Sequence, residues 1–232
     1  MKTPSAGGSP LSSVVDALRK LYGRPKPPPV RDPLEQLLWE NVAYLANDQR
    51  RAQAWKRFKR EVGTKPPQIL AAPRAKLLDI ARAGIAPSNS AEKLRETAAI
   101  ALDAFGGNLK PILKLPLQKA KKALRKFPSI GEPGAERILL FAGSHPVLAL
   151  DSNGLRVLHR LGFGEEDKSY AKSYRSAQEA LAPGLPLDTA WLTEAHQLLR
   201  RHGQELCKTN HPRCEACPLR PRCVYFLSLT ED

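Results

Sequence analysis

Hydrophobic residues recur at helical spacing along most of the chain. The stripe that follows Pro33 consists of Leu34, Leu37, Leu38, Val42 and Leu45, three or four residues apart. The same period, bounded by proline, glycine or capping residues, predicts further helices over residues 11–22, 52–62, 74–83, 90–105, 117–127, 134–142, 152–161, 169–181 and 187–201. No stretch alternates apolar and polar residues over a useful length, so the pattern predicts an all-α fold.

The beginning of the chain has a different composition. Residues 1–10 are rich in proline, glycine and serine, and we expect them to be disordered. Residues 11–32 combine a short helix with a proline-rich segment that cannot be helical and indicates a linker. We see no secretory signal here, and no run approaches the roughly 18 apolar residues of a membrane span.

The net charge suggests the class of partner. Lysine and arginine number 37 against 23 aspartate and glutamate, which gives a net charge of +14 and an isoelectric point near 9.9. Such a charge attracts polyanions, and nucleic acid is the leading candidate. A generic basic surface would account for the same numbers.

A glycine-containing turn, FPSIGEPGA at residues 127–135, separates two predicted helices. Its glycines permit a close backbone approach, and the N-terminus of the second helix can hold a phosphate. No acidic residue occurs between 104 and 131, where the lysines form a basic face. The residues predicted to contact DNA are Pro128, Ser129, Gly131, Gly134, Ala135, Lys122 and Lys126. A plain turn beside a solvated helix is the alternative, and Glu132 opposes phosphate binding.

Four cysteines cluster near the end of the sequence. Cys207, Cys214, Cys217 and Cys223 follow the spacing C-x6-C-x2-C-x5-C, and four thiolates suit either zinc or a [4Fe–4S] cluster. One compact loop with a single C-x2-C pair favours the cluster, although a zinc-binding transcription factor remains an alternative. The loop also carries Lys208 and Arg213, which can face a DNA backbone or serve only for solvation.

These motifs occur in an order that resembles a known family. The hairpin FPSIGEPGA, then LALDSNGLRVLHRLG, then the four cysteines resemble endonuclease III and the related adenine glycosylase over residues 30–225. The family is the helix-hairpin-helix DNA glycosylase superfamily. The resemblance implies two all-α lobes that hold DNA in a cleft: a six-helix barrel over 33–145, and a lobe over 146–232 whose [4Fe–4S] loop spans 207–223. Segment 11–32 is then expected to pack with the second lobe.

The resemblance also implies roles for individual residues. Asp151 aligns with the essential aspartate, whose carboxylate stabilises positive charge on the deoxyribose or orients the attacking water. A helix N-cap is its structural alternative. The lysine that attacks C1′ in bifunctional members lies 18 positions before that aspartate, and here Pro133 occupies the position. The sequence therefore predicts a monofunctional enzyme that uses water, unless Lys126 or Lys114 replaces the missing amine.

Glu40 lies seven residues after Pro33, the offset at which adenine glycosylases carry a catalytic glutamate. In an apolar pocket it would protonate the leaving base. Tyr44, one turn further on, is expected to stack on an extruded base. Glu40 on an exposed helical face and Tyr44 in the core are the structural alternatives.

The combined expectation is a monomeric glycosylase of base excision repair that acts on double-stranded DNA containing a lesion or mismatch. We expect it in the bacterial cytoplasm, associated with the nucleoid, and away from membranes. A bifunctional glycosylase and AP lyase is the first alternative, and a non-catalytic DNA-binding protein is the second. The excised base stays open among mispaired adenine or thymine, uracil, hypoxanthine and alkylated purines.

Overall fold

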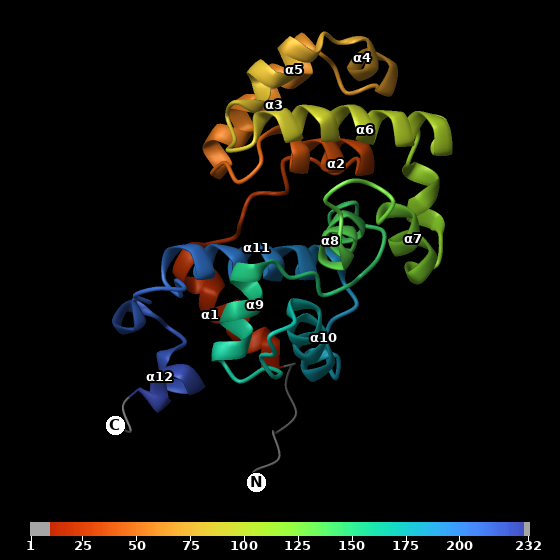
Figure 1. The fold of residues 1–232 in the computed structure, drawn as a ribbon. Helices are drawn as coiled ribbons and strands as arrows, with labels where there is room; N and C mark the ends of the chain where they lie inside the picture. Colours follow the sequence, from red (N-terminus) through yellow and green to blue (C-terminus); the bar gives the residue numbers. More distant parts are fainter. Residues whose placement is uncertain (1–9, 230–232) are drawn as a thin grey trace. The chain divides into compact units, whose positions relative to one another are not determined.

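The computed structural model describes residues 10–229, and within this range every regular element is a helix (Figure 1). The predicted all-α class is confirmed. None of the helices in this range has the length and hydropathy needed to cross a bilayer. The chain divides into two compact units. Unit 1 combines residues up to Pro27 with residues from Pro146 onward, and unit 2 contains residues 28–145.

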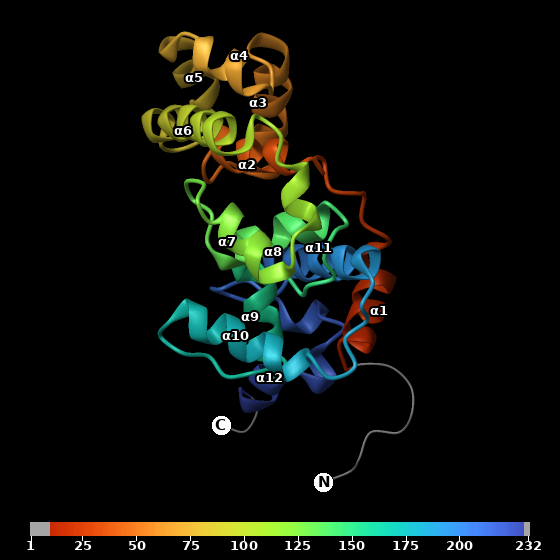
Figure 2. The same cartoon turned by 90° about the vertical axis from the view of Figure 1, so that its right-hand side faces the viewer.

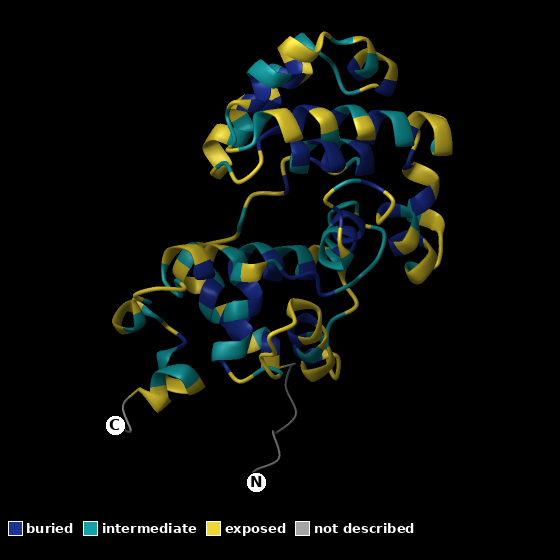
Figure 3. Cartoon of the chain, in the orientation of Figure 1, coloured by how far each residue is buried: buried dark blue, intermediate teal, exposed yellow. Residues whose placement is uncertain are grey.

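Unit 2 is built around one long helix. This helix, α6 (Pro87–Phe105), packs against α2 (Pro33–Val42), α4 (Pro66–Ala71) and α5 (Arg74–Ala81). The remaining helices of the unit are α3 (Asp48–Glu61), α7 (Leu117–Leu124) and α8 (Glu132–Phe141), with a 3-10 turn at Lys110–Lys114. Helix α2 is mostly buried in Figure 3, because its apolar stripe supplies much of the core.

Unit 1 brings the two ends of the chain together. Helix α11 (Thr189–Glu205) packs against α9 (Ser152–Arg160) and against α1 (Pro10–Tyr22), and both views show α1 beside α11 (Figures 1 and 2). The buried stripe of α1 consists of Leu11, Val14, Val15 and Leu18. Helix α10 (Tyr170–Leu181) contacts α9, and the short α12 (Val224–Ser228) follows the last cysteine.

The structure corrects several predicted boundaries. Pro10 begins α1, so the disorder predicted for 1–10 is wrong at that residue, and positions 1–9 lie outside the described residues. Residues 28–32 belong to unit 2, because Val30 is buried in its core. Helices α4 and α12 are absent from the sequence-based prediction. Leu45 does not extend the stripe of α2, because the helix ends at Val42 and Leu45 is exposed.

Candidate functional site

The hairpin between α7 and α8 is fixed by its apolar residues. Phe127 is buried and stacks on Phe105 with ring centroids 5.7 Å apart, and Ile130 is also buried. Ser129 between them is exposed and has a φ of 65°, in the left-handed region that costs an L-residue about 1–2 kcal/mol. The buried anchors therefore hold Ser129 at the surface in a strained conformation.

Helix α8 begins directly after the hairpin, with Gly131 as its N-cap. Pro133 in the first turn has no N–H, so one donor of the helix N-terminus is missing there. Gly131 is exposed, and Pro128 and Gly134 are partly exposed, as a phosphate contact requires. Ala135 is fully buried and its N–H donates to the Gly131 carbonyl at 3.0 Å, so we withdraw it from the predicted DNA contacts.

A buried lysine lies behind the hairpin. Lys121 on α7 pairs with Glu132 and, at 2.7 Å, with Glu136 Oε1, both on α8. Burial lowers the pKa of Lys121, but the hydrogen bonds with the two glutamates outweigh it, and the pKa lies above its ordinary value. Lys121 thus stays an ammonium ion and counters the negative charge of Glu132. The predicted contacts Lys122 and Lys126 are exposed near the same hairpin.

Glu40 has a partner that the sequence did not indicate. Its Oε1 lies 2.9 Å from Arg137 Nη2 on α8, and about a quarter of each side chain is exposed, 24% and 22% respectively. Gln36, one turn earlier on α2, also reaches α8 and donates to the Ile138 carbonyl at 3.1 Å. Glu40 is therefore held by an arginine rather than by the apolar surroundings that proton donation needs.

Tyr44 lies on the surface of unit 2 and not in its core. The residue is 46% exposed, and Lys93 Nζ lies 5.7 Å from the centroid of its ring. Its carbonyl accepts a hydrogen bond from the Ile85 N–H at 3.1 Å. An added Cβ at Gly84 would lie 2.6 Å from the Tyr44 backbone, so only glycine permits this close packing of two loops.

Two exposed apolar residues lie at this loop pair. The sequence pattern placed Leu45 in the helical stripe after Pro33 and did not single out Ile85. Leu45 is 64% exposed with a φ of 54°, and Ile85 is 68% exposed. The loops that carry them are joined through Tyr44, so both side chains project from one fixed platform. For Ile85, the sequence offered one signal of an exposed position: it is a bulky apolar residue directly after Gly84, where the pattern ends a helix. Leu45 gave no such signal, because it continued the helical period of α2.

Asp151 is the N-cap of α9, which is the structural role that the sequence offered as an alternative to catalysis. Its Oδ1 accepts the Gly154 N–H at 2.8 Å, and its Oδ2 accepts Asn153 Nδ2 at 3.1 Å. Arg200 Nε on α11 lies 3.5 Å from Oδ2, and 22% of the Asp151 side chain is exposed. Burial and the charge of Asp151 together raise the pKa of Tyr170 on α10. The carboxylate is thus fixed in unit 1, ion-paired and still reachable.

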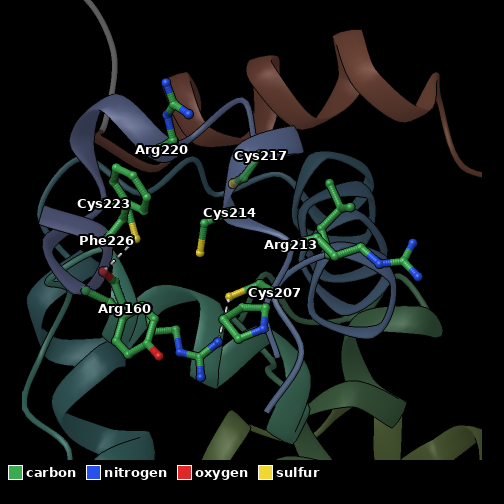
Figure 4. Close-up of a pocket in the computed structure, with 11 residues that line it drawn as sticks. Arg160, Cys207, Arg213, Cys214, Cys217, Arg220, Cys223 and Phe226 are labelled. Carbon is green, nitrogen blue, oxygen red and sulfur yellow. Dashed lines mark hydrogen bonds between the residues drawn. The ribbon is translucent and has the colours of Figure 1, made fainter. Parts of the chain in front are cut away.

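The four cysteines line a single cavity (Figure 4). All four belong to its wall, and the cavity is partly open to solvent. Arg160 Nη1 lies 3.4 Å from Cys207 Sγ, and the Cys223 thiol donates to the Arg160 carbonyl at 3.2 Å. The fold thus brings the sulfur atoms of cysteines up to 16 positions apart to one cavity, which is necessary if all four are to bind one metal centre.

The four sulfur atoms line this cavity but do not converge on one point. Among residues 10–229 no three histidine, cysteine or acidic side chains converge closely enough to bind a single metal ion. Burial first, then the neighbouring cysteines, raises the pKa of the Cys214 thiol, and burial also raises that of Cys217. Burial lowers the pKa of the adjacent His202 to about 4. Lys208 is partly exposed, and the exposed Arg213 points away from the sulfur atoms (Figure 4).

The chain is similar to a known protein family and to several known proteins. The model of the HhH-GPD superfamily of base excision DNA repair proteins matches residues 46–183. Endonuclease III of Rickettsia conorii is 33% identical over 108 residues, which are 47% of this chain and 48% of that protein. Endonuclease III of Thermotoga maritima is 25% identical over 195 residues, 84% of each chain. The chain thus spans about half the length of the first of these relatives.

Solved structures have the same fold. An endonuclease III trapped as a covalent DNA intermediate, in an estranged-adenine complex, superposes with a TM-score of 0.75 at 22% identity, over 99% of this chain and 100% of that one. A thermostable thymine-DNA glycosylase gives a TM-score of 0.74 at 19% identity, over 94% and 97%. The resemblance inferred from the three motifs is confirmed, and the chain belongs to the HhH-GPD superfamily of base excision DNA repair proteins.

Proposed function

We propose that this protein is a monofunctional DNA glycosylase, which hydrolyses the N-glycosidic bond of a damaged or mispaired base. The observation that carries the proposal is the chemistry at the hairpin. Pro133 offers no amine, and the buried amine nearby, Lys121, is held as an ammonium ion by two glutamates. A protonated amine is not a nucleophile, so it forms no Schiff base with C1′. Water is then the attacking group.

The hairpin supports DNA binding through the backbone. Ser129, Gly131 and the start of α8 present polar groups to solvent, and Lys122 and Lys126 add positive charge beside them. We assign the phosphate contacts to these residues with Pro128 and Gly134, and a further contact to Lys208 and Arg213 of the cysteine loop. Such contacts position a duplex without reading its sequence. The proposed partner is double-stranded DNA with a lesion or mismatch, bound by a monomer in the bacterial cytoplasm at the nucleoid.

Asp151 is proposed to stabilise the positive charge that develops on the sugar as the base leaves. A carboxylate with one oxygen held by Gly154 and the other by Asn153 and Arg200 has a fixed orientation. A charged group that is already oriented stabilises a transition state without reorganisation at the moment of reaction. Glu40, fixed by Arg137, is proposed to orient the base or the water by accepting a hydrogen bond.

Extrusion of the nucleotide requires something to fill the gap in the base stack. Leu45 and Ile85 are the exposed apolar side chains of the loop platform in unit 2, and apolar wedges of this kind unstack a base step. Tyr44 is proposed to stack on the extruded base through its exposed ring. The platform needs no rearrangement to present them, because the hydrogen bond from Ile85 to Tyr44 already joins the loops.

A [4Fe–4S] cluster is proposed for the cysteine cavity. Four thiols that line one cavity fit a polynuclear group better than a single zinc ion, because a zinc ion needs ligands that converge on one point and none converge so among residues 10–229. Cys207, Cys214, Cys217 and Cys223 would hold it. When bound, the cluster would stabilise the fold of the loop, since hydrolysis transfers no electron.

The proposed activity is tested with purified protein and a panel of duplexes that carry uracil, a G·T mispair, an A·G mispair, hypoxanthine or an alkylated purine. We expect release of at least one base and no covalent trapping under borohydride. Trapping would show a lyase and would point to Lys114 or Lys126 as the nucleophile. DNA binding without release from any duplex would favour a non-catalytic DNA-binding protein.

The role of Asp151 is tested with Asp151→Asn. Asparagine keeps an N-cap acceptor, so α9 stays folded while the charge is lost. We expect base release to fall by about 10²–10³-fold with DNA affinity retained. The matched control is Asp188→Asn, because Asp188 is the N-cap of α11 in the same unit. Equal activities of the two variants would remove Asp151 from the mechanism.

A further inference from the structure

A polar chain runs from the end of α1 to one of the cysteines. The Tyr22 hydroxyl lies 3.1 Å from His202 Nδ1, and His202 Nε2 lies 3.4 Å from Cys217 Sγ. His202 is 1% exposed, so no solvent molecule competes for either ring nitrogen. The three residues belong to α1, α11 and the cysteine loop, and together they connect the two ends of the chain within unit 1.

The chain is held in place from both sides. The rings of Tyr22 and His202 meet edge to face, with centroids 6.0 Å apart. Arg201 stacks its guanidinium 4.5 Å above the Tyr22 ring, and its Nη1 donates to the Tyr22 carbonyl at 3.3 Å. A second link joins α1 to the cysteine loop, because Arg222 donates to the Ser13 hydroxyl at 2.6 Å. The Tyr22 side chain is therefore ordered by its neighbours.

A ligand sulfur decides which nitrogen of His202 carries the hydrogen. Cys217 as a cluster ligand is a thiolate and can only accept, so Nε2 of the ring donates to it and Nδ1 accepts from the Tyr22 hydroxyl. A hydrogen bond to a ligand sulfur stabilises electron density on it, which favours the reduced state of an iron–sulfur cluster and strengthens the ligand's hold.

We propose that Tyr22 and His202 are positioning residues for the cluster, and that the hydrogen bond from His202 to Cys217 controls cluster retention and reduction potential. The inference rests on the proposed [4Fe–4S] cluster. Its consequence is that α1, far from the cysteines in sequence, is part of the cofactor site. Loss of the Tyr22 hydroxyl lets the His202 ring change tautomer, so the effect reaches Cys217 without any change in the cysteines.

Full-length holoprotein is purified anaerobically as wild type, Tyr22→Phe and His202→Phe. Two quantities are measured: the rate at which visible absorbance is lost in air with a chelator, and the midpoint potential of the cluster. We expect His202→Phe to lose its cluster roughly tenfold faster than wild type, the size typical of a lost outer hydrogen bond. Tyr22→Phe should show a smaller acceleration. In both variants the midpoint potential should fall.

Tyr22→Phe removes only a hydroxyl and keeps the ring contact, so it remains informative if His202→Phe fails to fold. The matched control is Tyr225→Phe, because Tyr225 lines the same cavity and its ring contact with Arg160, 4.3 Å from the centroid, does not depend on the hydroxyl. Variants with wild-type retention and potential would overturn the inference while leaving the cluster in place. An iron-free wild type would instead remove the proposed cluster, and the inference with it.

Discussion

Lys121 is the buried charge on which the hairpin depends, and Lys121→Met measures its contribution. Methionine has a similar length and no charge, so the substitution removes the ammonium with little change in volume. Glu136 exposes only 4% of its side chain and would lose the ammonium that faces it. Removing one partner of a buried ion pair costs about 3–5 kcal/mol. Glu132, 36% exposed, adds little, because exposed pairs contribute about 0–1 kcal/mol.

The expected loss of 3–5 kcal/mol is a large share of the roughly 5–15 kcal/mol by which folded proteins are stable. In a chain of 232 residues, each kcal/mol of lost unfolding free energy lowers the melting temperature by about 2–4 °C. The melting temperature should therefore fall by roughly 6–20 °C. The raised pKa of Lys121 sets the pH window. Its contribution is complete below the ordinary value of 10.5 and is lost as the pH rises through the higher folded value.

The assay is urea unfolding followed by far-ultraviolet circular dichroism at pH 7. Lys122→Met is the matched control, one position along and exposed, and it should change the free energy of unfolding by less than about 0.5 kcal/mol. The double variant Lys121→Met with Glu136→Gln should recover about 1–3 kcal/mol, because glutamine leaves no buried charge. Equal unfolding free energies for the two lysine variants would refute the assignment of a stabilising buried pair.

Two further predictions concern exposed residues. Ser129→Gly should raise the free energy of unfolding, measured in thermal melts, by about 0.5 kcal/mol. Glycine relieves about 1–2 kcal/mol of left-handed strain, which exceeds the cost of its added freedom in the unfolded chain. An unchanged or lower melting temperature would contradict the strain. The double variant Leu45→Ala with Ile85→Ala should lower single-turnover base release by roughly tenfold or more, because unstacking a base step costs a few kcal/mol. Its melting temperature should stay unchanged, because both side chains are exposed. Undiminished release would exclude them as wedges.

The periodicity of the sequence predicted most helices, and the failures have identifiable causes. Leu45 continued the apolar spacing of α2, and no glycine or proline marks the end of that helix. The chain leaves the helix after Val42, where the backbone of Tyr44 packs against Gly84. A tertiary contact between positions 40 residues apart thus decides the local structure, and local pattern cannot reveal it.

The residue types of the site were predictable from the sequence, whereas the ion pairs that these residues form were not. The hairpin and the four cysteines are local motifs, so their spacing singled them out, and Asp151 was singled out by the resemblance to the glycosylase family. Glu132 was read as an obstacle to phosphate because its partner lies 11 positions earlier on another helix. Arg137 and Glu40 are 97 positions apart, and nothing in either segment indicates their ion pair. The contact of α1 with α11 is likewise a property of the folded chain.

These pairings bear on which base the proposed glycosylase would release. Glu40 and Asp151 each have an arginine within their own unit, Arg137 and Arg200 respectively. A carboxylate oxygen that faces an arginine acts as a hydrogen-bond acceptor. Purine release gains most from protonation of the base, whereas a pyrimidine such as uracil or mispaired thymine leaves as an anion, whose charge must be stabilised together with that of the sugar cation. We therefore expect the proposed glycosylase to process uracil or the G·T mispair in the duplex panel faster than the A·G mispair. Faster release of adenine would contradict this expectation.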